Sequence, residues 1–288
     1  MYQSYTAEDL NQHFSKQSTD SDYTSTNVKF TANPISGSSL ISEYQIFLML
    51  DKLKSTAAGP DEIPFWFLKI ASPSISLPLS YLFNLSFQTG IVPHQWKNAN
   101  IVPIPKVPCP SSPSDFRPIL LTPIISRLFE RVVVKTNIYT LFFNPTLAAL
   151  FSDQYAFRPF GSTDAAIISI IHHVTSLLSD GNSYVRLIGL DFSKAFDTVK
   201  HSCILSKLSS LPISDQLYNW LVNYFQGHSH TTRFNSTTSS TAKINASVFQ
   251  GSAIGPSLFV INGIDLKPVH KENYIDKYAD DSYLITSS

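Results

Sequence analysis

The chain has 288 residues, of which 43% are hydrophobic and 12% aromatic, so it is long enough to bury one large core or two smaller ones. Only 15% of the residues are charged and the formal net charge is zero, a balance that does not favour a nucleic-acid partner. The richest apolar stretch, residues 138–151, is too short to span a bilayer, and no membrane partner is expected. The first residues lack a secretory signal pattern, and two cysteines, Cys109 and Cys203, fit a reducing compartment. We therefore expect an intracellular location, in the nucleus or cytoplasm, rather than secretion.

Positive charge is concentrated in one part of the chain. Between residues 97 and 135 the basic side chains are Lys97, Lys106, Arg117, Arg127, Arg131 and Lys135, against only Asp115 and Glu130. This stretch could face phosphates. On charge alone, a solvated basic surface is the simpler interpretation.

The predicted elements alternate between helices and short strands. In chain order, polar composition predicts a flexible lead-in over residues 1–40. Helices are predicted over residues 41–54, 64–71, 76–89, 123–141, 163–179 (capped by Ser162), 199–209 and 214–226. A Gly-rich turn over residues 249–256 is expected to open a further helix that runs to about 266. Strands are predicted over residues 96–106, 184–190, 231–234, 243–248 and in a hairpin over 274–285. Because prolines interrupt residues 96–106, that strand is expected at a sheet edge. The mixture predicts an α+β architecture.

One acidic residue stands at the end of an apolar strand. The run over residues 184–190 leads directly to Asp191, followed by Phe192-Ser193-Lys194-Ala195-Phe196-Asp197. A buried strand that delivers an acid at its end holds the carboxylate in a defined place. The simpler alternative is a cap for the next helix.

A second acidic feature is the tetrapeptide Tyr278-Ala279-Asp280-Asp281. Strand-forming residues flank it, so it predicts a hairpin with two carboxylates at the tip. A doubled acid in such a place is most often a solvated turn. A functional site would need a cation, because adjacent carboxylates repel, and hard oxygen ligands favour Mg²⁺ or Mn²⁺.

The two acidic features together are more informative than either one alone. Two strands could bring Asp191, Asp280 and Asp281 to one place. Three carboxylates around two divalent ions, about 3.5–4 Å apart, are the apparatus of in-line phosphoryl transfer. The sequence thus raises a metal-dependent nucleotidyl transfer as a hypothesis.

Several further segments match a known pattern in order. They are Ala58-Gly59-Pro60-Asp61, Ile104-Pro105-Lys106, Phe116-Arg117-Pro118-Ile119, Phe157-Arg158-Pro159 with Ser162-Thr163, Leu190 to Asp197, Gln250-Gly251-Ser252-Ala253-Ile254-Gly255-Pro256, and Tyr278-Ala279-Asp280-Asp281. These segments resemble the ordered motifs of reverse transcriptases, most closely those of non-LTR (LINE-type) retrotransposons. The resemblance covers roughly residues 40 to 288.

The resemblance implies a polymerase right hand of class α+β. A small antiparallel palm sheet would pack on helices, and fingers and palm would fill residues 41–288, after the lead-in at residues 1–40. The family continues past the acidic hairpin into a primer grip and a helical thumb. We therefore expect the thumb to be missing and the domain to be truncated at its C-terminal side.

Metal and catalytic residues follow from the same resemblance. Asp191, Asp280 and Asp281 match the palm carboxylates, which hold two ions, Mg²⁺ or Mn²⁺. The backbone carbonyl of Phe192 matches a further metal ligand beside the nucleotide. The implied activity is RNA-directed DNA polymerisation, with an RNA template, a DNA primer and dNTPs as partners.

Other matched residues would bind the incoming nucleotide. Phe196 matches the steric gate that selects dNTPs, the alternative being an ordinary core aromatic. Gln250 and Gly251 match the loop that touches nucleotide and template, where Gly permits close backbone approach. Lys106 and Arg117 resemble the basic fingers residues that grip the triphosphate, a task suited to a guanidinium.

Three more residues have structural interpretations. We expect Asp197 to be the N-cap of the following helix rather than a ligand. Arg158 serves either structure or the template backbone. Asp276 is expected to be solvent-facing or structural.

The chain also departs from the family. Phe249 stands where the group usually has a rigid Pro, and Ser247 where it has Gly, which affects the loop that carries Gln250. With the missing thumb, this keeps a second hypothesis open, an inactive remnant with at most weak nucleic-acid binding. A third, nucleotide cyclisation by the same palm chemistry, is disfavoured by the ordered fingers motifs.

Overall fold

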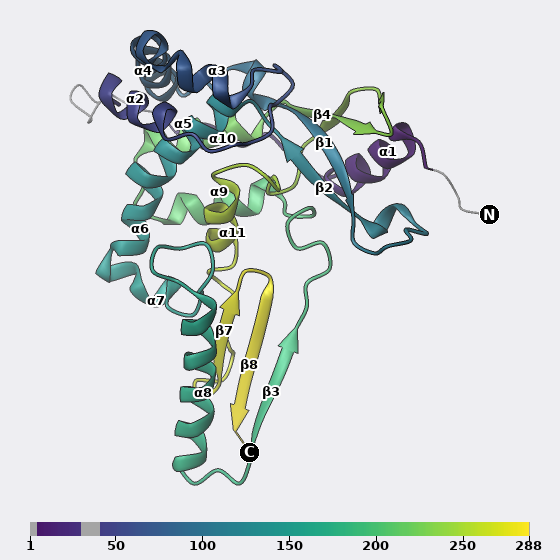
Figure 1. The fold of residues 1–288 in the computed structure, drawn as a ribbon. Helices are drawn as coiled ribbons and strands as arrows, with labels where there is room; N and C mark the ends of the chain where they lie inside the picture. Colours follow the sequence, from purple (N-terminus) through teal and green to yellow (C-terminus); the bar gives the residue numbers. More distant parts are fainter. Residues whose placement is uncertain (1–4, 30–40, 288) are drawn as a thin grey trace. The chain divides into compact units, whose positions relative to one another are not determined.

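The structure is a computed structural model that describes residues 5–29 and 41–287. The chain divides into two compact units (Figure 1). The first unit comprises Met1–Val133 and Phe196–Gly255, and the second comprises Val134–Ala195 and Pro256–Ser288. Each unit is therefore built from two separate stretches of sequence.

The first unit combines a mixed sheet with helices. Its strands are β1 (Asn98–Pro105), β2 (Phe116–Leu121), β4 (His228–Phe234), β5 (Thr237–Thr238) and β6 (Ala242–Ile244). Its helices are α1 (Ala7–Gln17), α2 (Glu43–Asp51), α3 (Phe65–Ile70), α4 (Ser72–Thr89), α5 (Ile124–Val133), α9 (His201–Ser210) and α10 (Asp215–Phe225), with short 3-10 turns at His94–Lys97 and Pro113–Asp115. The strand order is β2-β1-β4-β5, and β6 also pairs with β4.

The expectation that the proline-containing strand lies at a sheet edge is wrong. β1 pairs with β2 in antiparallel fashion and with β4 in parallel fashion. The β4 ladder involves only Asn98 to Ile101, whereas Pro103 and Pro105 come later and pair only with β2. Because proline lacks a backbone donor, it is tolerated in the part of β1 that has a single neighbour.

Stacked aromatic rings form the core of the first unit. Phe129 of α5 lies 4.5 Å from Phe83 of α4, 5.6 Å from Trp96 and 5.4 Å from Trp220 of α10, measured between ring centroids. The Trp220 indole N–H donates to the Ser86 hydroxyl at 3.2 Å. Buried aromatic pairs add specific contacts to a large buried area, so this cluster ties helices α4, α5 and α10 together.

The expectation of a flexible lead-in does not hold for residues 7–17. Helix α1 begins with a capping box between Thr6 and Asp9, and it buries Leu10 and Phe14. It packs against β4 and β6. A short apolar stripe in a polar segment was enough for this docking, while residues 1–4 and 30–40 lie outside the described residues.

The second unit holds a small antiparallel sheet with a long helix beside it. Its elements are the π-turn Val134–Ile138, α6 (Tyr139–Phe143), the 3-10 turn Pro145–Leu147, α7 (Ala148–Phe151), α8 (Thr163–Ser179), β3 (Val185–Leu190), α11 (Gly255–Asn262, which starts at the unit boundary), β7 (Tyr274–Tyr278) and β8 (Asp281–Ser287). The strand order is β3-β8-β7, and α8 runs along β7 (Figure 1).

The predicted α+β architecture is confirmed by these elements. The antiparallel sheet with its helix matches the expected small palm sheet, and α8 has the predicted bounds and the predicted cap, since the Ser162 hydroxyl accepts from the Ala165 N–H at 3.1 Å. The helix predicted over residues 123–141 is interrupted by the π-turn at residues 134–138. Within residues 5–29 and 41–287, no helix is both long and apolar enough to cross a bilayer.

Candidate active site

Strand register brings two of the predicted catalytic acids to neighbouring positions. β3 pairs with β8 up to Leu190 opposite Ser282. Continuing this register by one residue sets Asp191 opposite Asp281, the first residue of β8. Residues directly opposite each other in an antiparallel pair point to the same face of the sheet. The two carboxylates therefore leave the sheet on one face, at one end.

The third acid sits in the turn of the hairpin. Tyr278 pairs with Asp281, which leaves Ala279 and Asp280 as a two-residue loop between β7 and β8. Ala279 has φ 57°, in the left-handed region that costs a non-glycine residue about 1–2 kcal/mol. A positive φ at the first loop residue matches the twist of paired strands. The tetrapeptide thus forms the predicted hairpin, although Asp281 belongs to the strand rather than the turn.

The carboxylates of Asp191, Asp280 and Asp281 are available for a ligand. Asp191 and Asp281 are exposed and Asp280 is half-buried. Their side chains hold no hydrogen bond or ion pair with any other described residue. Asp281 also lines a pocket of about 170 Å³ beside α8, together with Thr163.

The carboxylates of Asp191, Asp280 and Asp281 are of the chemical type that a hard divalent ion binds, since Mg²⁺ and Mn²⁺ prefer carboxylate and carbonyl donors. The backbone carbonyl of Phe192 follows Asp191 directly and is a candidate fourth donor group. The side chains are not gathered, however: no three His, Cys, Asp or Glu side chains in the described parts of the chain lie in a metal-holding cluster. The three-carboxylate metal centre therefore stays a prediction.

The strand that precedes the turn is tied down by buried polar side chains. Asp276, which is 2% exposed, accepts from the Ser169 hydroxyl at 3.1 Å and contacts His173 Nδ1 at 3.1 Å, both on α8. Of the two roles expected for Asp276, solvent-facing or structural, the structural one is observed. Lys277, on the other face, donates to the Gly263 carbonyl at 2.8 Å and pairs with Asp153 at 3.2 Å, and burial lowers the pKa of Lys277.

The segment before α8 contributes contacts that sequence reasoning missed. Gln154 bridges in parallel to Lys277 and contacts the backbone of Ala279. Nearby, Arg158 donates to the Phe151 carbonyl, so of its two predicted roles the structural one is observed. No local pattern signals the contacts of Gln154, because they join residues more than a hundred positions apart.

In the first unit the predicted steric gate and the Gly-rich loop meet. The backbone carbonyl of half-buried Phe196 accepts from the Val248 N–H at 2.8 Å. The Gln250 side-chain amide donates to the Asp197 carboxylate at 2.9 Å. The expectation that Asp197 caps the following helix is wrong, because α9 starts at His201 with Lys200 as its N-cap. The carboxylate instead anchors Gln250.

Gly251 is required by contact with the chain itself. Its φ is 117°, and a Cβ there would lie 2.2 Å from the Leu120 carbonyl oxygen of β2. The Leu120 N–H also donates to the Gln250 carbonyl at 2.9 Å. The close backbone approach predicted for this glycine is therefore seen against β2, which fixes the loop on the strand that carries Arg117.

Phe249, at the position where the family usually has Pro, holds the Gly-rich loop through its buried side chain. It is 3% exposed, and its ring lies 4.2 Å from His228 and 6.0 Å from His201. Burial lowers the pKa of His201 to about 4 and that of His228 to about 3, so both rings stay neutral. A buried aromatic side chain thus holds the loop where a rigid backbone would otherwise be expected.

The predicted phosphate-gripping cations lie on the β1–β2 hairpin. Arg117 is opposite Ile104, and Lys106 follows two residues later, its N–H donating to the Asp115 carbonyl at 2.7 Å. Arg117 and Lys106 are both exposed and lie diagonally on one face of the hairpin. Lys97 does not share this surface: it is 7% exposed, donates to Asn223 and has its pKa lowered by burial to about 8.

A buried acid binds the backbone of the Gly-rich loop that carries Gln250 and Gly251. Glu130 of α5 accepts from the backbone N–H groups of Ala253 and Ile254 at 2.6 and 3.2 Å, and from the Ser126 hydroxyl at 3.2 Å. Burial raises the pKa of Glu130 to about 7, against the lowering effect of these hydrogen bonds. Backbone donors in a turn lack ladder partners, so this carboxyl satisfies them.

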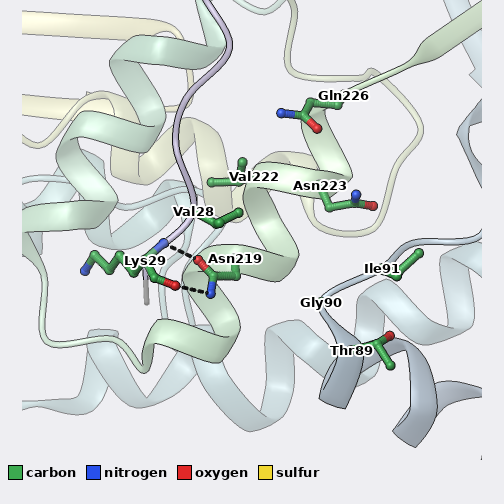
Figure 2. Close-up of a pocket in the computed structure, with 9 residues that line it drawn as sticks. All are labelled: Val28, Lys29, Thr89, Gly90, Ile91, Asn219, Val222, Asn223 and Gln226. Carbon is green, nitrogen blue, oxygen red and sulfur yellow. Dashed lines mark hydrogen bonds between the residues drawn. The ribbon is translucent and has the colours of Figure 1, made fainter. Parts of the chain in front are cut away.

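An open pocket lies elsewhere in the first unit. It has a volume of about 510 Å³ and is lined by Val28, Lys29, Thr89, Gly90, Ile91, Asn219, Val222, Asn223 and Gln226 (Figure 2). At its rim the Asn219 amide pairs with the backbone of Lys29, at 2.7 and 2.9 Å (Figure 2). None of the predicted site residues lines it.

Comparison with known proteins identifies related sequences. Residues 104–288 match a family described as reverse transcriptase (RNA-dependent DNA polymerase). The chain is 29% identical over 240 residues to the probable RNA-directed DNA polymerase from transposon BS of Drosophila melanogaster, covering 80% of this chain and 26% of that protein. It is 27% identical over 219 residues to the RNA-directed DNA polymerase from mobile element jockey of the same species, covering 73% of this chain and 23% of that protein.

A third relative is the retrovirus-related Pol polyprotein from type-1 retrotransposable element R2 of Popillia japonica, 28% identical over 188 residues, covering 64% of this chain and 25% of that protein. The chain spans about a quarter of the length of these curated relatives. Among solved structures, telomerase from Candida tropicalis in complex with a fragment of telomeric RNA aligns with a TM-score of 0.49 at 14% identity, covering 75% of this chain and 40% of that chain.

Proposed function

The chain belongs to the reverse transcriptase (RNA-dependent DNA polymerase) family, and from this premise we propose that it adds deoxynucleotides to a DNA primer on an RNA template. The family expected from the motifs is confirmed, and the relatives are polymerases of non-LTR retrotransposons. In the proposed reaction the primer 3′-hydroxyl attacks the α-phosphorus of a dNTP, the bond to the β-phosphate oxygen breaks, and pyrophosphate leaves.

The single observation that carries this proposal is the register of the second unit's sheet. The last pair of β3 and β8 is Leu190 with Ser282, so extending the register by one residue puts Asp191 opposite Asp281, with Asp280 in the adjoining turn. All three carboxylates are free of other partners among the described residues. A solvated turn would account for Asp280 and Asp281, but it gives no reason for a third acid at the neighbouring strand end.

We propose that these carboxylates, with the Phe192 carbonyl, hold two divalent ions, Mg²⁺ or Mn²⁺. When bound, such ions lower the pKa of the attacking hydroxyl and stabilise the leaving pyrophosphate. The chain's own part is to supply oxygen donors just after a strand end and in a short turn. It also leaves these donors exposed, so that a phosphate can complete the coordination.

The first unit supplies the proposed nucleotide contacts. Lys106 and Arg117, exposed on one face of a hairpin, hold the triphosphate. Gln250 and Gly251 carry the backbone of the nucleotide loop, fixed on β2. The Phe196 ring excludes a 2′-hydroxyl, and its backbone bond to the same loop keeps it in place.

The test is incorporation of a single dNTP into a DNA primer on an RNA template, with Mg²⁺ or Mn²⁺. We expect Asp280→Asn to lower the rate roughly a hundredfold or more, the scale of losing one contact to the reacting charge. The matched control is Asp180→Asn, an exposed acid at the C-terminal end of α8. Equal rates for the wild type and Asp280→Asn contradict the proposed site. No incorporation by the wild type contradicts the proposed activity and favours an inactive remnant.

The finer partner and location assignments are proposals as well. The partners are the RNA template, the DNA primer and dNTPs, and the location is the nucleus or cytoplasm. In support of a reducing compartment, Cys109 and Cys203 are both unpaired and exposed.

A further inference from the structure

A buried side-chain amide supports the acidic turn of the second unit. Gln154 is 4% exposed, and its side-chain oxygen accepts from the Ala279 N–H at 3.2 Å and the Ala156 N–H at 3.0 Å. Its side-chain nitrogen lies 3.5 Å from the Ala279 carbonyl oxygen, toward which it donates. The amide therefore pairs with both backbone groups of the residue next to Asp280.

The backbone around Gln154 is fixed to the strand that leads into the turn. The Tyr155 N–H donates to the Lys277 carbonyl at 2.8 Å, and the Lys277 N–H donates to the Asp153 carbonyl at 2.7 Å. The Asp153 carboxylate then pairs with the ammonium groups of Lys277 and Lys267, at 3.2 and 2.6 Å. This network leaves the Gln154 side chain little freedom to move relative to β7.

The turn needs such support for two physical reasons. Ala279 has a φ of 57°, a conformation in which an alanine is strained relative to a glycine. Its N–H also lies in the loop, beyond the last ladder pair of Tyr278 and Asp281, so no strand partner accepts it. Gln154 supplies the missing acceptor and stabilises the strained conformation.

We propose that Gln154 is a positioning residue that holds Ala279 in its left-handed conformation and so sets the placement of the Asp280 and Asp281 carboxylates. The inference rests on the proposed function for its catalytic consequence, although not for its structural one. Gln154 acts through Ala279 and touches no reacting atom. Losing it loosens the metal-holding oxygens without touching the nucleotide contacts of the first unit.

The main variant is Gln154→Met in the full chain, which keeps the buried volume and removes the three polar contacts. The matched control is Asn182→Ala, which removes another side-chain amide bond to backbone, to the Leu177 carbonyl at 2.7 Å. Asn182 belongs to the connection between α8 and β3, and this connection lies at the opposite end of the sheet from the β7–β8 turn (Figure 1). If Gln154→Met does not fold, Gln154→Asn, which draws the amide back by one methylene, takes its place.

The first two readouts do not depend on polymerisation. In Gln154→Met, hydrogen exchange of the Ala279 amide accelerates about tenfold or more, the scale of one lost hydrogen bond. Mn²⁺ binding, followed by electron paramagnetic resonance, weakens about tenfold as well. Asn182→Ala changes neither. Gln154→Glu keeps the acceptor oxygens and leaves the Ala279 amide slow to exchange.

The third readout separates positioning from general destabilisation. In single-nucleotide incorporation, Gln154→Met lowers kcat about tenfold with an unchanged KM for the dNTP. Adding Ala279→Gly, for which a positive φ is unstrained, recovers part of the lost kcat and Mn²⁺ affinity but none of the lost amide protection.

Unchanged exchange at Ala279 in the folded variant overturns the inference, and so does an absence of recovery with glycine. A wild type that binds Mn²⁺ yet incorporates nothing contradicts the proposed function alone. The exchange and binding measurements then still decide the role of Gln154.

Discussion

Replacing Glu130 by Gln should change how the stability of the first unit depends on pH. The Glu130 side chain is 2% exposed, and burial raises its pKa from 4.5 to about 7. Between these two pH values the unfolded chain is ionised while the folded chain keeps its proton. The contribution of Glu130 to stability is therefore complete below about pH 4.5 and is lost as the pH rises through about 7.

The size of this loss follows from the two pKa values. Each tenfold change in an ionisation equilibrium corresponds to about 1.4 kcal/mol, so ionising Glu130 in the folded state costs about 3 kcal/mol, an order-of-magnitude figure. A Gln side chain has nearly the same shape. Its oxygen can accept from Ala253 and Ile254 and its amide can donate to the Ser126 hydroxyl, without any charge to bury.

The assay is chemical denaturation of wild type and Glu130→Gln, followed by the fluorescence of Trp96 and Trp220, which lie in the aromatic core of the same unit. The unfolding free energy of the variant minus that of the wild type should be about 2–3 kcal/mol larger at about pH 8 than at about pH 5. The buried His201 and His228, with their lowered pKa values, destabilise both proteins equally as the pH falls, so they cancel in the difference. A difference that is the same at both pH values would refute the reasoning.

Two further predictions concern the loop and the gate. Gly251→Ala should cost about 1–3 kcal/mol of stability and slow incorporation, because its Cβ would lie 2.2 Å from the Leu120 carbonyl oxygen. The measurement is thermal unfolding, and the control is Gly227→Ala, where φ is also positive at 73° but no atom lies within 4 Å of the added Cβ. Equal losses of stability in the two variants contradict the steric explanation. Phe196→Ala should lower the preference for dNTPs over rNTPs, measured as the ratio of kcat/KM values, by at least about tenfold; an unchanged ratio assigns Phe196 to the core instead.

Local patterns predicted the elements that carry the acids. The apolar run before Asp191 became β3, and the strand formers around Asp280 became a hairpin. Both signals are short-range, since alternation and turn chemistry depend on neighbours in sequence. The ordered motifs then supplied the family, which no single motif could have done.

Long-range contacts explain what local patterns missed. Asp197 looked like a helix cap because a short polar side chain precedes α9, but its carboxylate binds Gln250, fifty-three positions away. Helix α1 was missed for a related reason: its polar composition predicts disorder, while the burial of Leu10 and Phe14 depends on strands formed much later in the chain. Tertiary packing decided both cases.

The two loops with family motifs share one physical solution. Each turns sharply, so its backbone N–H groups have no strand partner and must find an acceptor or remain unsatisfied. Glu130 accepts from Ala253 and Ile254 in the Gly-rich loop, and Gln154 accepts from Ala279 in the acidic turn. Neither acceptor belongs to the motif it supports, and both are buried. Residues outside the motifs therefore hold the backbone of the proposed site, and a substitution that removes either acceptor should impair the proposed function while leaving every motif intact.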